Sequence, residues 1–166
     1  MRGVPAGVAL RAAIILGLQA CAWSDRSDRL PTENLPVEAL AAAVQCGASP
    51  RTPAAVWLGD ANSLAEVVAK SVGMATPQVD FGASQVLLIG MGQRSTTGYA
   101  VGLARDTAAL EQGTLTVLVT WKEPGEGVMT GQMLTNPCLL VRVPRASFER
   151  VRVVDQDGRE RAATAR

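Results

Sequence analysis

Apolar and polar residues alternate most regularly over residues 114–121. Leu115, Val117, Val119 and Trp121 take every second position, and threonine fills three of the other four positions of this segment. Successive side chains of a strand point to opposite faces of the sheet. This pattern therefore predicts a β-strand with one buried face.

An unbroken apolar run over residues 85–91 (QVLLIGM) predicts a strand of a different kind. A strand that is apolar on both faces suits the centre of a sheet that is covered on both sides. Further short strands are predicted at 54–58, 99–103, 128–135, 139–143 and 151–153, the third of them returning antiparallel after a turn at 122–127. Residues 37–46 are ambiguous between helix and strand, and we favour a strand for their second half.

A single helix is predicted over residues 63–72. Ser63 and Glu66 have the spacing of a capping box, and Gly73 supplies a C-terminal stop. The apolar side chains of the segment recur at helical spacing, on Leu64, Val67, Val68 and Val72. With several strands, short links and one short helix near the start, the expected fold is mainly β (α+β), an antiparallel sheet or sandwich.

The chain contains no histidine, which excludes imidazole catalysis and histidine-ligated metal sites. Its carboxylates are scattered, and no pair has a spacing that would place it across a cleft. We therefore expect no enzyme activity, no catalytic residue, no cofactor and no metal. Few aromatic residues and a formal charge of +1 give no support to nucleic-acid binding.

Residues 1–20 have the pattern of a secretory signal, in which Arg2 and Arg11 form a positive region before a short apolar run at 12–18. Removing them takes two of the 16 basic residues and none of the 15 acidic ones, so the mature chain has a net charge of 14 − 15 = −1. The run is shorter than the ~20 residues that cross a bilayer.

The four residues that end at Cys21 (LQAC) resemble the lipobox of bacterial lipoproteins. That resemblance implies lipidation of Cys21 and a membrane anchor. Ala22 follows Cys21, and the absence of aspartate there implies the periplasmic face of the outer membrane. An ordinary signal peptide with an unmodified Cys21, and a retained anchor, are the alternatives.

The rest of the chain divides by composition. Residues 21–36 are polar and punctuated by proline, which is typical of a tether. Residues 37–158 are expected to form one β-rich domain, and residues 159–166 a flexible tail.

Two further cysteines, Cys46 and Cys138, fall inside the expected domain. In an oxidising compartment two thiols of one small domain commonly pair, so we predict a disulfide between them. Two buried free thiols are the alternative.

The most distinctive surface segment is Thr96-Thr97-Gly98-Tyr99. Gly98 permits a positive φ, and the two hydroxyls can fix the shape of a loop. The segment is either a well-made turn with Tyr99 packed into the sheet or a loop that binds a partner.

A second candidate site is a group of arginines near the C-terminus. The group is either a solvated face or a docking patch for an acidic partner, and its members are Arg142, Arg145, Arg150 and Arg152.

Residues 79–155 resemble the C-terminal domain of the protease complex subunit PrcB family. The resemblance rests on the order of several elements: Val79-Asp80-Phe81, the T-x-G-Y turn, the alternating strand, Lys-Glu-Pro-Gly, and Asn136-Pro137-Cys138. The family turn usually reads T-G-G-Y, and Thr97 departs from that pattern.

The resemblance implies a non-enzymatic lipoprotein that binds and stabilises an envelope or surface protein, with a protease among the expected clients. The Thr96–Tyr99 segment is also similar to a loop of chagasin-like cysteine protease inhibitors, although no other loop of that family has a counterpart. A structural envelope lipoprotein without a defined client is the third hypothesis.

Overall fold

The computed structural model describes residues 32–47 and 49–166. Within these residues one helix, α1 (Ala61–Ala69), accompanies ten strands, which are β1 (Glu33–Pro36), β2 (Glu38–Ala43), β3 (Ala54–Leu58), β4 (Ser84–Gly90), β5 (Ala100–Leu103), β6 (Thr107–Glu111), β7 (Thr114–Lys122), β8 (Cys138–Pro144), β9 (Arg150–Val154) and β10 (Glu160–Ala165). Cys21 and the expected signal lie outside the described residues. The described part contains no helix that is both long and apolar enough to span a membrane.

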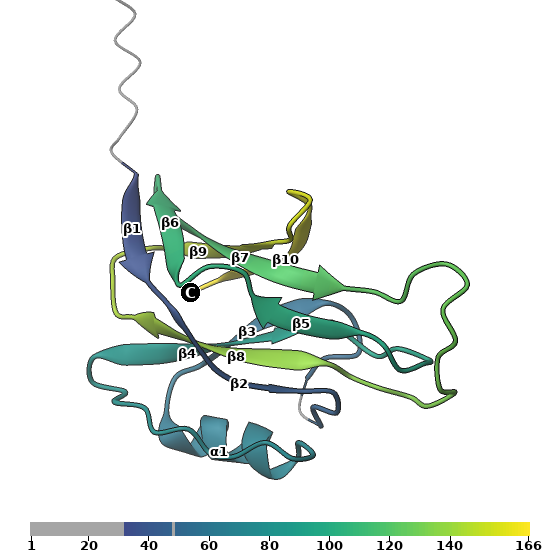
Figure 1. The fold of residues 1–166 in the computed structure, drawn as a ribbon. Helices are drawn as coiled ribbons and strands as arrows, with labels where there is room; N and C mark the ends of the chain where they lie inside the picture. Colours follow the sequence, from purple (N-terminus) through teal and green to yellow (C-terminus); the bar gives the residue numbers. More distant parts are fainter. Residues whose placement is uncertain (1–31, 48) are drawn as a thin grey trace, which may run out of the picture.

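The strands form two sheets that pack face to face (Figure 1). One has the order β1-β6-β7-β9-β10, with β5 also paired to β7, and the other has the order β2-β8-β4-β3. Neighbouring strands are antiparallel except β7 and β9, which run parallel. The predicted fold class, mainly β with one short helix, is confirmed.

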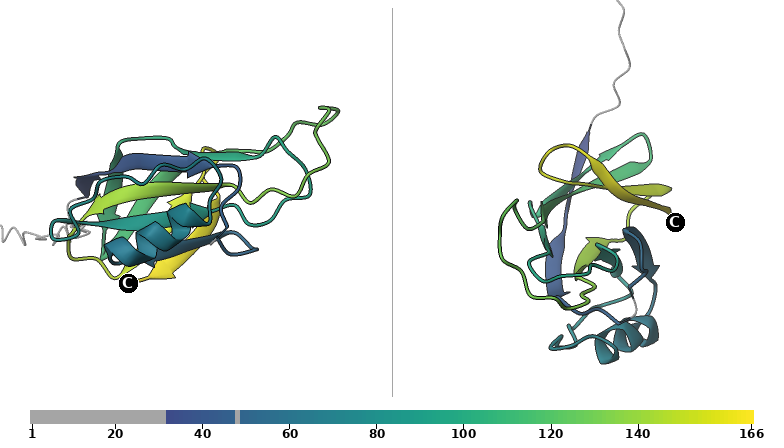
Figure 2. Two further views of the ribbon diagram at one scale, coloured as in Figure 1. Left: turned by 90° about the horizontal axis from the view of Figure 1, so that it is seen from below. Right: turned by 90° about the vertical axis from the view of Figure 1, so that its right-hand side faces the viewer.

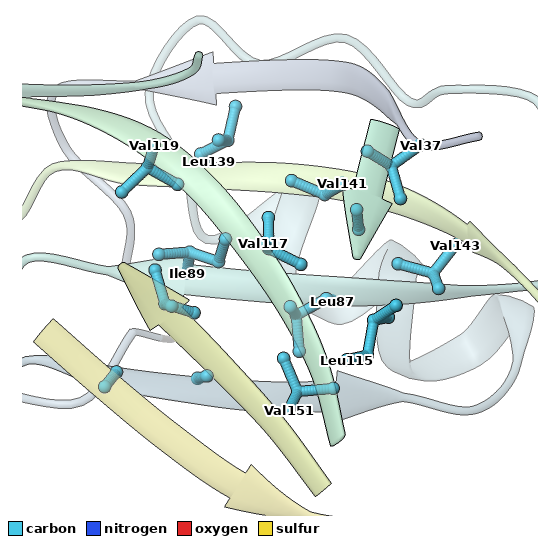
Figure 3. Packing of buried hydrophobic residues seen from close by; sticks show 14 of the residues in the cluster. Val37, Leu87, Ile89, Leu115, Val117, Val119, Leu139, Val141, Val143 and Val151 are labelled. Carbon is cyan, nitrogen blue, oxygen red and sulfur yellow. The ribbon is translucent and has the colours of Figure 1, made fainter. Parts of the chain in front are cut away.

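The main core lies between the two sheets (Figure 3). Leu115, Val117 and Val119 of β7 face Leu87 and Ile89 of β4, and all five side chains are fully buried. The apolar positions of the alternating pattern over residues 114–121 are therefore the buried inner face of β7, as predicted.

A second core lies between the four-stranded sheet and α1, and the helix packs on the outer face of that sheet (Figure 2). Val86 and Leu88 of β4 turn toward this layer and pack with Leu64 and Val67 of the helix. Because β4 is covered on both faces, its sequence is an unbroken apolar run rather than an alternating one.

The helix begins earlier than predicted. Asp60 is the N-cap, and its carboxylate accepts hydrogen bonds from the backbone N–H groups of Asn62 and Ser63 at 2.8 and 2.9 Å. Ser63 is therefore the third helical residue of the capping box and not its start. Val72 follows the end of α1 and is exposed, so its predicted place on the buried face was wrong. Glu66 and Lys70 form an i,i+4 ion pair on the helix, with Nζ of Lys70 2.5 Å from Oε1 of Glu66.

Both ends of the domain extend beyond the predicted limits of 37 and 158. The last residues of the expected tether form β1, which pairs with β6. The expected flexible tail forms β10, which pairs with β9 and buries Ala162. Short strands that are rich in alanine and polar residues show little alternation of apolar and polar positions. These two form because neighbouring strands pair with them.

Strands β1 and β2 form one continuous crossing from the first sheet to the second. Val37 links them, buried, and its N–H donates to the carbonyl of Asp106 at 2.8 Å. The chain therefore enters at one end of the sandwich and is carried toward the other (Figure 2).

Candidate partner-docking site

Two loops project from one end of the sandwich, residues 92–99 between β4 and β5, and residues 123–137 between β7 and β8 (Figures 1 and 2). We call them the paired loops. The strand registers bring them together, because Gly90 lies opposite Cys138 and Ala100 lies opposite Lys122.

Backbone hydrogen bonds join the paired loops at two levels. Near the sheet, the N–H of Arg94 donates to the carbonyl of Thr135 at 2.8 Å, and the N–H of Thr135 donates back at 2.9 Å. Further out, the N–H of Thr97 donates to the carbonyl of Gly131 at 3.0 Å. The two loops therefore brace one another, although neither has regular secondary structure.

The side chain of Thr97 adds a bond that glycine could not make. Its hydroxyl oxygen accepts the N–H of Gly131 at 2.9 Å. The departure from the T-G-G-Y pattern thus gives the paired loops an additional cross-link. Thr96 contributes through its backbone, because its carbonyl accepts the hydroxyl of Thr135 at 2.9 Å.

Gly98 fills a place where the backbone needs glycine for two reasons. Its φ is 96°, in the positive range that glycine permits. A Cβ at this position would lie 3.0 Å from Cγ of Pro124 and 3.4 Å from Cγ2 of Thr130. Close approach of the second loop therefore depends on the missing side chain.

Tyr99 is half-buried and packs against the main core. The guanidinium of Arg94 lies over its ring, 5.2 Å from the centroid. The contacts of the Thr96–Tyr99 segment thus assign it a part in shaping the loops, and whether a partner also touches it remains a prediction.

Exposed apolar side chains gather on the longer loop. Val128 is 59% exposed, Met129 98%, Met133 54% and Leu134 58%. Val44, 50% exposed, adjoins the base of this loop, since its carbonyl accepts the N–H of Asn136 at 3.0 Å. These five account for most of the large apolar side chains that are exposed in the described residues, where the other two are Val56 and Val72.

The predicted strand over residues 128–135 was wrong. Because a strand there would have buried part of its apolar side chains, no exposed cluster was expected from the sequence. Pro124, Gly125, Gly127, Gly131 and Pro137 interrupt the segment or flank it. Proline lacks the ladder donor and glycine gains little from strand pairing, so the segment loops outward. Apolar residues between such breakers are the signal that would have revealed an exposed loop.

The longer loop is also acidic. Glu123 and Glu126 are its only charged residues. Glu123 accepts the indole N–H of Trp121 at 2.9 Å and lies 3.4 Å from the guanidinium of Arg161. Glu126 is exposed beside the apolar cluster.

The predicted disulfide between Cys46 and Cys138 is present at the base of the longer loop, with the two Cα atoms 5.9 Å apart. Both cysteines are buried in the second core. Asn136 reinforces the junction, because its Nδ2 donates to the carbonyls of Cys46 and Ser49 at 2.9 and 3.0 Å.

The arginines near the C-terminus do not gather into one patch. Arg142 pairs with Glu38 on the four-stranded sheet, whereas Arg150 and Arg152 pair with Glu160 on the other sheet. Neutralisation by these partners favours the interpretation of solvated faces. Across residues 32–47 and 49–166, no group of three or more acidic or cysteine side chains is placed to hold a metal ion.

Comparison with known proteins gives one match. The family model described as PrcB C-terminal matches residues 85–144, from the start of β4 to the end of β8, and so includes both paired loops. The predicted resemblance to the PrcB family is confirmed over this segment. No curated protein and no solved structure matches the chain.

Proposed function

With the PrcB C-terminal match over residues 85–144 as the premise, we propose that this protein is a non-enzymatic accessory subunit of a cell-envelope protease complex. It binds its partner through the paired loops and stabilises it. A lipid on Cys21 holds it at the periplasmic face of the outer membrane, and residues 22–32 serve as the tether.

One observation carries the docking role, namely the exposed apolar cluster on loops that brace one another. Burying a large aliphatic side chain or methionine contributes about 1.5–3 kcal/mol, so even two of the four on the longer loop make an effective anchor. Binding energy in interfaces is concentrated in such central side chains. Because the loops are already held by hydrogen bonds, little conformational entropy is lost when a partner settles on them.

The proposal is tested by crosslinked co-purification from envelope membranes with a C-terminally tagged protein. We expect a protease to be recovered with the wild type, and at least about tenfold less of it with Met129→Ser/Met133→Ser, a loss of at least about 1.4 kcal/mol. Val72→Ser is the matched control, because Val72 is 72% exposed but lies outside the paired loops. Undiminished recovery with a folded double variant would exclude this docking surface.

Anchoring is tested separately with Cys21→Ser, which we expect to move the protein from the membrane to the soluble fraction. A protein that stays in the membrane would point to a retained anchor instead. Recovery of only abundant envelope proteins with the wild type would favour a structural role without a defined client.

A further inference from the structure

A small apolar hollow lies beside the paired loops, where the two sheets meet without pairing. Its volume is about 120 Å³, and it is lined chiefly by Ala43, Val44, Tyr99, Ala100 and Pro137. An apolar cavity of roughly 150 Å³ can hold a benzene molecule, so this one is the size of a single large side chain.

The hollow lies along a strand edge that makes no backbone pairing on its outer side within the described residues, although β2 passes close to part of it. There β5 pairs with β7 alone, and β2 pairs with β8 alone. The N–H of Ala104, just past β5, donates to the carbonyl of Leu118 of β7 at 3.0 Å. Because backbone groups alternate in direction along a strand, the N–H and C=O of Val101 and Leu103 point to the other side. The four residues of β5 carry no charge that would repel an added strand.

We propose that the hollow receives one apolar side chain of an extended segment of the partner, which runs along the edge of β5. This inference rests on the proposed function and adds to it a mode of recognition, in which main-chain pairing gives affinity and a side-chain pocket gives specificity. The pocket takes an aliphatic or aromatic side chain, and it excludes a charged one because its lining offers no counter-charge.

The hollow is continuous with the proposed docking surface, which is why we assign it to the partner. Val44 lines the hollow and is also one of the exposed apolar side chains at this end. The chain's own tether contains Trp23, but that residue lies two positions after Cys21, whose lipid would hold it at the bilayer. The described chain also begins away from the paired loops (Figure 2).

The test is selection from a displayed library of random peptides against the purified Cys21→Ser protein. We expect enriched peptides to share one large apolar residue, and to bind at least about tenfold more weakly to Ala100→Trp, which fills the hollow. Ala42→Leu fills it from the side of β2, because Ala42 also lines the hollow, and it should have the same effect. Val72→Ser should bind like the parent, and circular dichroism should show native spectra for all variants.

Equal binding of the selected peptides to Ala100→Trp and to the parent, or no enrichment at all, would overturn the proposal. Some peptides could bind Ala100→Trp as well as the parent but fail to bind Met129→Ser/Met133→Ser. That result would overturn the proposal for the hollow and would still support docking at the paired loops. Tighter peptide binding after Trp23→Ala would show that the tether fills the hollow, which also overturns the assignment to the partner.

Discussion

Individual residues of the paired loops do not only form turns but also hold the two loops against one another. The sequence showed that Gly98 permits a positive φ, and the structure has one there. It did not reveal that Pro124 and Thr130 would close over that glycine, because the contact joins positions far apart in the chain. The cross-link made by Thr97 escaped prediction for the same reason.

Replacing Gly98 by alanine should lower the free energy of unfolding by about 1–3 kcal/mol, since the new Cβ meets both a positive φ and the neighbouring loop. Urea unfolding measures this loss. Gly102→Ala is the matched control, because Gly102 lies in β5 without a positive φ, and a Cβ added there would meet no atom within 4 Å. Equal stabilities for the two variants would mean that the loops shift apart at no cost.

At the scale of elements, prediction succeeded where burial is strong and failed where it is weak. The strands β4, β7 and β8 lie at the centres of the sheets, and their apolar patterns indicated both their limits and their faces. The edge strands β1 and β10 are short and mostly polar or alanine, so their sequences resemble a tether and a tail. Neighbouring strands determine their conformation, and that information is not local.

The β9–β10 hairpin depends on Asp155, a carboxylate that is 1% exposed. It accepts the backbone N–H groups of Asp157 and Arg159 at 2.9 Å each, and Nε of Arg161 at 2.6 Å. Burial alone would raise the pKa of Asp155, but the hydrogen bonds and the charge of Arg161 outweigh it and lower the pKa below its usual value.

Because the folded pKa of Asp155 is lowered, its contribution to stability is complete above the unfolded pKa of about 3.9 and is lost as pH falls through the folded value. We expect Asp155→Asn to be less stable than the wild type at pH 7, and the difference to shrink as the pH is lowered below about 4. Thermal unfolding across this range measures both. Asp157→Asn keeps the three donors to Asp155, so it should follow the wild type. A constant gap between Asp155→Asn and the wild type would contradict the assignment.

At the scale of the whole molecule, the Cys46–Cys138 disulfide closes a segment with a sequence separation of 92 residues. Loss of a cross-link over such a loop should lower the free energy of unfolding by about 4–5 kcal/mol in the chain-entropy model. We expect this loss for Cys46→Ala/Cys138→Ala in urea unfolding, compared in the Cys21→Ser background. A loss below about 1 kcal/mol would mean that the two cores determine stability without the cross-link.

The same disulfide also determines how the molecule would carry a mechanical load. A pull between a membrane anchor and a docked partner enters through β1, follows β2 to Cys46, crosses to Cys138 and reaches the longer loop directly. The covalent route thus bypasses α1 and β3 to β7, although these elements form much of the two cores. A client held under tension would strain one edge of the sandwich and leave the rest of the domain unloaded.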